Sequence, residues 1–280
     1  MIVTKISDGL GNQLFMYACG FACSKRLNVP LVLDATQMSN NQLRQLEINK
    51  FNLRYDRMVL PAKSKIRVFR ALKFKIIRMF YKSFLHYYRE KQNFVLDNAI
   101  LNIERNSYLD GYWQNEKYFI EYRKELLDMI TPKIVTSEGY NKYAALIKEC
   151  NSVAVHIRLG DYCKSGLCVD DSYYSKAIAY LKSQIGDKVK LFLFSDDVEK
   201  ATEIFSKFGV PFQVVSYSSE NKTVEDLLLM SLCKCNIIAN SSYSWWGAWL
   251  NNNVNKVVVC PETDMWIEDF YPTDWCRIKL

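Results

Sequence analysis

From residue 151 to residue 260 the sequence alternates short apolar runs with longer segments of helical apolar spacing. The short runs predict strands, and the longer segments predict helices because their apolar residues recur every three or four positions. The expected strands are 153–157, 190–194, 211–217, 236–240 and 256–260, and the expected helices are 172–185, 197–208, 223–233 and 241–251. Strands that alternate with helices build a parallel sheet covered by helices on both faces. This half of the chain is therefore expected to be a doubly wound, Rossmann-like α/β domain.

The first half begins with one strand–helix–strand unit in residues 2–34. IVTKI is a β-branched strand, SDGLGN a glycine turn, QLFMYACGFACSKRL a helix and LVLD the next strand. Further helices are expected at 116–130 and 138–149. We place the domain boundary after the proline that stops the first of these, giving an N-terminal α/β domain at 1–140 and a C-terminal Rossmann-like domain at 141–280. Two facing α/β domains would leave a cleft between them.

Positive charge is concentrated in residues 61–91. The chain has a formal net charge of +7, and this segment accounts for all of it, with ten lysines and arginines against one acid, Glu90. The basic residues fall near one face of an expected amphipathic helix. Three interpretations stay open: a solvated face, a nucleic-acid surface, or contact with an anionic membrane. No recognition motif supports nucleic acid as a partner, and we hypothesise peripheral association with the inner face of the cytoplasmic membrane.

The nine cysteines are odd in number and fit no zinc-ligand spacing, so no metal site is expected. The start of the chain has no apolar stretch and cleavage site typical of a secretory signal. We therefore expect reduced cysteines and a cytoplasmic protein. No window of about 20 apolar residues predicts a helix that spans a membrane.

Three of the expected strands in the second half end in polar clusters. These are His156 and Arg158, then Ser195, Asp196 and Asp197, and then Asn240, Ser241 and Ser242. Each cluster alone has a structural explanation, because Asp and Ser before a helix are usually N-caps and a strand-end histidine is usually a satisfied core residue. The carboxyl ends of parallel strands, however, meet at one edge of the sheet, where ligands bind. Their convergence predicts a ligand site.

The chemistry of these clusters suits a nucleoside diphosphate. Arg158 offers a planar, permanently charged fork for a phosphate. Ser241 and Ser242 open a helix, whose N-terminus supplies N–H groups and the positive end of the dipole. An aspartate can accept the paired N–H groups of a guanine edge. The glycine loop at residues 9–12 matches neither the dinucleotide fingerprint nor the ATPase phosphate loop, so neither of those functions is supported.

Five stretches carry a resemblance to a known family: DGLGNQLFMYA, GYWQNEKYF, HIRLGDY, LFLFSDD and DLLLMSLCKCNIIANSSYSWWGAWLN. In this order, along nearly the whole chain, the sequence resembles the bacterial α-1,2-fucosyltransferases of glycosyltransferase family 11. The resemblance implies a GT-B fold with two facing Rossmann-like domains, the N-terminal one on the acceptor side. It implies inverting transfer of L-fucose from GDP-fucose to the 2-hydroxyl of a galactoside, with no metal and no resident cofactor.

The donor-binding residues that this resemblance implies are Gly9, Gly11, Asn12, His156, Arg158, Ser195, Asp196, Asp197, Asn240, Ser241 and Ser242. Arg158 would contact the β-phosphate and His156 the nucleoside. Asp196 would read guanine, with Asp197 as second choice. Asn12 would lie by the bond between phosphate and sugar.

One position departs from the family pattern. The family usually has His-x-Arg-Arg-x-Asp, and here Leu159 replaces the second arginine. Successive side chains at a strand end point to opposite faces, so Arg158 can keep the phosphate contact without it. The base that takes the acceptor proton stays open between Asp8 and Asp161, and Asp161 could equally hold Arg158 in place.

The expected acceptor is a galactose-terminated glycan, such as a lipid-linked oligosaccharide of the O-antigen type in lipopolysaccharide biosynthesis. Two alternatives remain: a related glycosyltransferase with another nucleotide sugar or linkage, and a non-catalytic nucleotide-binding protein at the membrane surface. The three polar strand ends argue against the second alternative, because membrane binding needs none of them.

Overall fold

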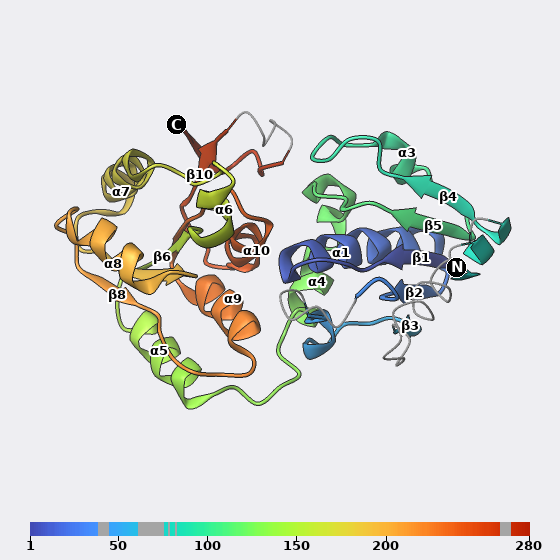
Figure 1. Cartoon of the computed structure of the whole chain (residues 1–280), viewed down its shortest axis with the longest axis horizontal. Coiled ribbons are helices and arrows are strands. Elements are labelled where there is room, and N and C mark those ends of the chain that lie inside the picture. The colour runs from blue at the N-terminus through green and yellow to red at the C-terminus, as the bar shows by residue number, and fades with distance from the viewer. Residues whose placement is uncertain (39–44, 61–75, 78, 82, 264–269) are drawn as a thin grey trace. The chain divides into compact units, whose positions relative to one another are not determined.

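The computed structural model describes residues 1–38, 45–60, 76–77, 79–81, 83–263 and 270–280 (Figure 1). The chain divides into two compact units, unit 1 (Met1–Ile134) and unit 2 (Val135–Leu280). The division falls a few residues before the expected boundary at 140. Each unit is built on its own parallel sheet, so the α/β class expected from the sequence is confirmed.

The sheet of unit 1 has the strand order β3-β2-β1-β5-β4, and all of its pairs are parallel in the described residues. Its strands are β1 (Ile2–Lys5), β2 (Leu31–Asp34), β3 (Arg57–Val59), β4 (His86–Arg89) and β5 (Ser107–Asp110). The described helices are α1 (Leu10–Leu27), α3 (Asn98–Leu101) and α4 (Arg123–Met129), with 3-10 turns η1 (Ile48–Lys50), η2 (Glu116–Tyr118) and η3 (Ile120–Tyr122).

Helix α1 lies along the sheet of unit 1 (Figure 1), and residues 13–23 are all buried. A Cβ at Gly20 would come within 2.7 Å of Thr4 Cγ2, so the missing side chain lets the helix approach β1 closely. Thr4 Oγ1 also donates to the carbonyl oxygen of Met16 at 3.1 Å. This packing fixes the short loop between β1 and α1 at the carboxyl edge of the sheet.

Some local expectations in unit 1 were wrong. The glycine turn is shorter than expected, because α1 begins at Leu10 and therefore includes Gly11 and Asn12 in its first turn. The single helix expected at 116–130 is divided into η2, η3 and α4, and Phe119 separates the first two. The amphipathic helix expected in the basic segment 61–91 falls largely outside the described residues, because residues 61–75, 78 and 82 are not among them, and β4 lies near the end of the segment.

The sheet of unit 2 has the order β11-β10-β9-β6-β7-β8, again with parallel pairs in the described residues. Its strands are β6 (Ser152–Ile157), β7 (Lys190–Ser195), β8 (Phe212–Val214), β9 (Cys235–Ile237), β10 (Val258–Glu262) and β11 (Cys276–Lys279). Its described helices are α5 (Glu138–Lys148), α6 (Gly160–Lys164), α7 (Asp171–Ile185), α8 (Val198–Ser206), α9 (Lys222–Leu232) and α10 (Ser242–Leu250).

The burial of the central strands of unit 2 explains why they could be predicted from the sequence. Strand β6 lies between β7 and β9, and all six of its residues are buried, because helices cover parallel sheets on both faces. Strand β11 was not expected from the sequence. It is a half-buried edge strand with two basic residues, so its pattern lacks the apolar run that marks the central strands.

None of the helices in the described ranges combines the length and the apolar character needed to cross a membrane.

Candidate active site

The polar residues that follow β6, β7 and β9 lie near the switch point of the sheet of unit 2, on whose two sides the chain adds its strands in opposite directions. From β6 the chain proceeds through β7 to β8 on one side, whereas β9, β10 and β11 lie on the other side. The switch point is therefore between β6 and β9, and ligands of doubly wound sheets bind in the crevice outside the strands at such a point. The expected strand ends after β6, β7 and β9 are thus neighbours, as predicted.

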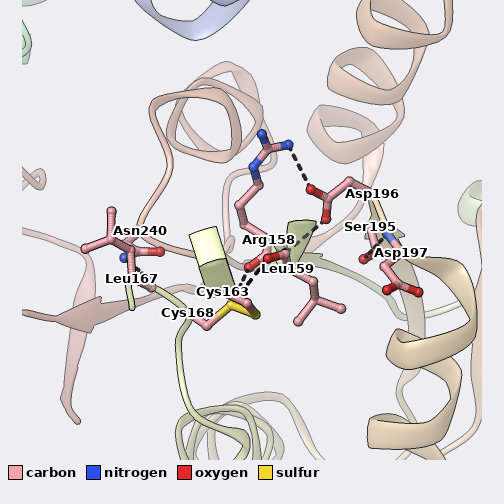
Figure 2. The surroundings of a disulfide bond; sticks show 9 residues. All are labelled: Arg158, Leu159, Cys163, Leu167, Cys168, Ser195, Asp196, Asp197 and Asn240. Carbon is pink, nitrogen blue, oxygen red and sulfur yellow. Dashed lines mark hydrogen bonds and ion pairs between the residues drawn. A yellow bond between two sulfur atoms is a disulfide. The ribbon is translucent and has the colours of Figure 1, made fainter. Parts of the chain in front are cut away.

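Arg158 follows β6 and is held by Asp196 at the end of β7. Its Nη1 lies 3.2 Å from Asp196 Oδ2, and about a quarter of each side chain is exposed. The other carboxylate oxygen, Oδ1, accepts a hydrogen bond of 2.9 Å from the backbone N–H of Leu159. The guanidinium carbon also lies 5.4 Å from the centre of the Tyr162 ring, within cation–π range. Figure 2 shows the guanidinium turned toward Asp196, so the protein itself fixes the orientation of this arginine before any ligand binds.

The three polar residues at the end of β7 and directly after it make different contacts. Asp197 caps α8 by accepting the N–H of Lys200 at 3.1 Å, and Ser195 Oγ accepts the N–H of Asp197 at 3.1 Å. Asp196 uses both carboxylate oxygens within the protein, while its role as a guanine reader stays a prediction. A Cβ at Gly160 would come within 2.7 Å of Asp196 Oδ2, so glycine at this position makes room for the carboxylate.

His156 is a buried, uncharged ring. It is 6% exposed, and its ring centre lies 5.7 Å from that of Tyr243 in α10. Burial, with a smaller contribution from Arg158, lowers the pKa of His156 from 6.5 to about 3. Its Nδ1 has no hydrogen-bond partner among the described residues. The ring therefore supplies no positive charge near neutral pH, and it could contribute to a ligand site only through hydrogen bonding or packing.

The segment from Ile238 to Ser241 connects β9 to α10. Ser241 is the N-cap of this helix, and its Oγ accepts the N–H of Tyr243 at 3.3 Å. Ser242 is the first helical residue, and the three tryptophans of the helix are buried, which anchors it in the core. Asn240 is buried, and its Oδ1 has no partner among the described residues. Unsatisfied buried polar atoms are uncommon, so their presence on both sides of the switch point supports a ligand site here.

A disulfide closes the loop after Arg158, which corrects the expectation of reduced cysteines. Cys163 and Cys168 are bonded, and Cys168 Sγ lies 3.4 Å from the carbonyl oxygen of Arg158 (Figure 2). Asn240 Nδ2 donates to the carbonyl oxygen of Leu167, inside the disulfide-closed loop, at 2.9 Å. The loop therefore connects the backbone of the arginine to the end of β9. This pair was not predicted, because a separation of five residues does not distinguish bonded from free cysteines.

Leu159 and Asp161 complete the HIRLGDY stretch. Leu159 is 6% exposed and packs in the core of unit 2, and Figure 2 shows its side chain directed away from the guanidinium of Arg158. The residue that replaces the family arginine is thus a core residue in this chain. Asp161 lies in α6, and its side chain is outside the part of the chain that the structure describes.

The remaining predicted residues belong to unit 1. Gly9 is the N-cap of α1, and Gly11 and Asn12 are in its first turn. Asn12 Oδ1 accepts a hydrogen bond from Gln114 Nε2 at 2.8 Å. Asp8 has a positive φ of 63° and accepts a hydrogen bond from the hydroxyl of Tyr112 at 3.0 Å. The pairing of this loop with the GYWQNEKYF stretch was not predicted, although both stretches were noted as family-like.

Three tyrosines near these sites were also missed. Tyr162 lies against Arg158, Tyr243 against His156, and Tyr112 against Asp8. Tyr162 follows Arg158 by four positions, so its spacing offered a local signal. The other two contacts join residues far apart in the sequence. Within the described ranges, no group of three or more His, Cys, Asp or Glu residues is arranged to hold a metal ion.

Two of the solved structures of similar fold are fucosyltransferases. One is the NodZ alpha-1,6-fucosyltransferase of Bradyrhizobium, soaked with GDP-fucose, with a TM-score of 0.51, 14% identity and coverage of 89% of this chain and 91% of that chain. Another is Arabidopsis thaliana FUT1 in complex with GDP, with a TM-score of 0.52, 10% identity and coverage of 97% and 75%. At these identities the likeness establishes the fold alone. The two parallel-sheet units of this chain therefore have the GT-B type of fold.

The family follows from the sequence itself. The model of glycosyl transferase family 11 matches residues 1–279, and the chain belongs to this family. The Alpha-1,2-colitosyltransferase of Escherichia coli is 33% identical over 301 residues, covering 100% of this chain and 99% of that protein. The O-antigen biosynthesis glycosyltransferase WbnK of Escherichia coli is 33% identical over 287 residues, covering 91% and 92%. The chain is therefore a glycosyltransferase by family, which argues against the non-catalytic alternative.

Family membership also supports a nucleotide-sugar donor, as expected from the sequence. The sugar, the linkage and the roles of individual residues are a separate question.

The buried ring of His156 predicts a pH dependence of stability. Below its ordinary pKa of 6.5 the histidine of the unfolded chain takes up a proton, whereas the folded ring, with a pKa of about 3, does not. Stability is therefore lost as pH falls, by about 2 kcal/mol between pH 7 and pH 5. Denaturant titrations at both pH values should show this loss in the wild type and a smaller one in His156→Asn. Equal losses in the two proteins would contradict a neutral buried ring.

Proposed function

We propose that this protein is a galactoside α-1,2-fucosyltransferase. It transfers L-fucose from GDP-fucose, with inversion at the sugar carbon, to the 2-hydroxyl of a terminal galactose. The observation that carries the proposal is the Arg158–Asp196 pair at the switch point of unit 2, together with membership of family 11. The relative soaked with GDP-fucose has the same fold, which adds support for the donor.

The site chemistry supports departure of GDP without a metal ion. As the bond between sugar and phosphate breaks, negative charge grows on the β-phosphate and the sugar becomes oxocarbenium-like. Arg158 is a permanent cation already oriented by Asp196, and it can stabilise that charge without reorganisation. The N-terminus of α10, capped by Ser241, adds N–H groups and the positive end of its dipole. His156 would contribute hydrogen bonding near the nucleoside, because its ring is uncharged.

A second candidate is transfer of colitose, since the 33% identical relative is named an alpha-1,2-colitosyltransferase. Colitose is fucose without its 3-hydroxyl group, so the two donors differ by one hydrogen-bonding group. A site that hydrogen-bonds this hydroxyl would discriminate against the deoxygenated sugar by a factor of about 10⁴. A site that merely accommodates it would discriminate by about 10² or less.

The test compares GDP-fucose and GDP-colitose with the wild-type enzyme, a panel of β-galactosides and EDTA. Product mass, product linkage and GDP release are measured. We expect fucosylated product with a 1,2 linkage, at a kcat/KM well above that for colitose and unaffected by EDTA. Product with colitose alone would replace the first candidate by the second. Absence of transfer from both donors would reject both.

The acceptor and the membrane partner stay predictions. An O-antigen-type acceptor is supported by the relative named for O-antigen biosynthesis. A lipid-linked acceptor would place the enzyme at the inner face of the cytoplasmic membrane, with segment 61–91 as the contact. Co-sedimentation with vesicles that ignores anionic lipid content would argue against that contact.

A further inference from the structure

Unit 1 has its own switch point, between β1 and β5. The chain passes from β1 through β2 to β3 on one side, whereas β5 and β4 lie on the other side. Two hydrogen bonds join the segments that follow β1 and β5. Tyr112 donates to Asp8 Oδ2 at 3.0 Å, and Gln114 Nε2 donates to Asn12 Oδ1 at 2.8 Å. Ligands of doubly wound sheets bind at such points, so this edge of unit 1 is the place where a second ligand is expected.

Asp8 has an unusual backbone conformation at this edge. Its φ of 63° lies in the left-handed region, which costs energy for a residue other than glycine and often marks a functional position. Gln13 Nε2 donates to the Asp8 carbonyl oxygen at 2.7 Å, which holds the residue in that conformation. The surrounding structure therefore fixes where the carboxylate lies.

The carboxylate of Asp8 is oriented through one of its two oxygens. Ser7 Oγ donates to Oδ2 at 2.9 Å, and the Tyr112 hydroxyl donates to the same oxygen. No residue in the described ranges donates a hydrogen bond to Oδ1. The side chain is partly exposed, so Oδ1 has the geometry of a proton acceptor held in place by its partner oxygen.

A second carboxylate fixes the loop that carries Tyr112. Glu90 accepts the backbone N–H of Tyr112 at 2.6 Å and that of Trp113 at 3.1 Å. A Cβ at Gly111 would come within 2.4 Å of Glu90 Cβ, so the loop lies tightly against this residue. Tyr112 is thereby held against Asp8, and burial, together with the Asp8 charge, raises the Tyr112 pKa to about 12, so the hydroxyl stays a donor.

The other described carboxylates at this edge are paired, hydrogen-bonded or buried. Asp110 forms an ion pair with Lys5 at 3.0 Å and accepts a hydrogen bond from Tyr87. Glu90 accepts two backbone N–H groups, as described above. Asp34 is 2% exposed. Compared with these three groups, Asp8 is partly exposed and has a carboxylate oxygen, Oδ1, that accepts no hydrogen bond from a described residue.

We propose that Asp8 is the general base of the transfer, and that Tyr112 and Ser7 position it. The proposal rests on the proposed function, because it requires a sugar hydroxyl as acceptor. The acceptor oxygen attacks the anomeric carbon and its proton passes to Asp8 Oδ1. The bond between sugar and phosphate breaks at the same time, and its electron pair leaves on the β-phosphate of GDP. Asp8 then returns the proton to water.

The test is Asp8→Asn in the full-length enzyme. Asparagine tolerates the left-handed conformation and keeps the shape of the side chain, but it cannot take the proton. We expect the rate of transfer to the galactoside acceptor to fall at least 100-fold. GDP affinity by calorimetry should stay within about threefold of wild type, since it does not depend on an acceptor proton, whereas donor hydrolysis should fall with transfer, because the attacking water also loses a proton. Azide needs no base, so azide-driven GDP release should survive.

Two control variants make the result specific. Asp97→Asn applies the same change at the N-cap of α3, where either residue serves, and should leave transfer unchanged. Tyr112→Phe removes one of the two bonds that orient Asp8, and an intermediate loss of transfer, about tenfold, is expected.

Transfer by Asp8→Asn within tenfold of wild type would overturn the proposal. So would a loss of transfer accompanied by loss of GDP affinity or of thermal stability, because Asp8 would then be structural. Failure of the proposed function is seen separately, as absence of transfer by the wild-type enzyme.

Discussion

Arg158→Ala is expected to reduce sugar transfer by about 10³-fold at saturating acceptor. The guanidinium lies at the switch point of unit 2, where Asp196, 3.2 Å away, orients it. Removing a preorganised group that stabilises charge in the transition state typically costs two to three orders of magnitude in kcat. Donor hydrolysis should fall together with transfer, because both require GDP to depart. The measurement is GDP release with and without acceptor.

This signature differs from that expected for Asp8→Asn, because GDP release driven by azide should survive in Asp8→Asn and fall in Arg158→Ala. Arg158→Lys keeps the charge but loses the planar fork, so partial activity is expected. Arg57→Ala removes an exposed arginine from the edge strand β3 and serves as the control, with activity unchanged. Turnover near that of the wild type in Arg158→Ala would remove Arg158 from the mechanism.

The arginine–aspartate pair illustrates the limit of sequence reasoning at this site. Both residues were predicted as donor ligands because each follows an apolar strand. Their contact depends on the register of β6 and β7, which sets Ile157 opposite Ser195 and so brings the next residues, Arg158 and Asp196, side by side. A register between strands far apart in sequence is set by tertiary packing. Asp196 was therefore assigned to guanine, with no indication that it holds the arginine.

Local pattern was sufficient for the buried part of the fold. The alternation of apolar strands and helices predicted the doubly wound sheet of unit 2, because its central strands are covered on both faces. The same pattern missed the half-buried edge strand β11 and misplaced the ends of some elements. The end of β9 was placed at Asn240, whereas the strand stops at Ile237. Ser241 N–H bonds back to the Ala239 carbonyl oxygen, forming a turn that precedes α10.

Leu159→Arg is expected to destabilise the protein instead of restoring a second phosphate ligand. Leu159 is 6% exposed and packs in the core of unit 2, on the side away from Arg158 (Figure 2). An arginine at this position would bring an unpaired charge into the core, which costs several kcal/mol even after relaxation. The measurement is the midpoint of denaturant unfolding, combined with kcat for transfer.

Leu159→Met is the matched control, because it keeps the volume and apolar character and should cost less than about 1.5 kcal/mol. Long basic side chains can bury their apolar stems while the charged group stays in solvent, so the new arginine could instead extend its guanidinium out of the core. In that case stability would stay near that of the control and kcat would rise, which would reverse our assignment. The two outcomes separate a position used for packing from a position that lost a ligand. The backbone N–H of Leu159, which holds Asp196 at 2.9 Å, is present in all three proteins, so the comparison isolates the side chain.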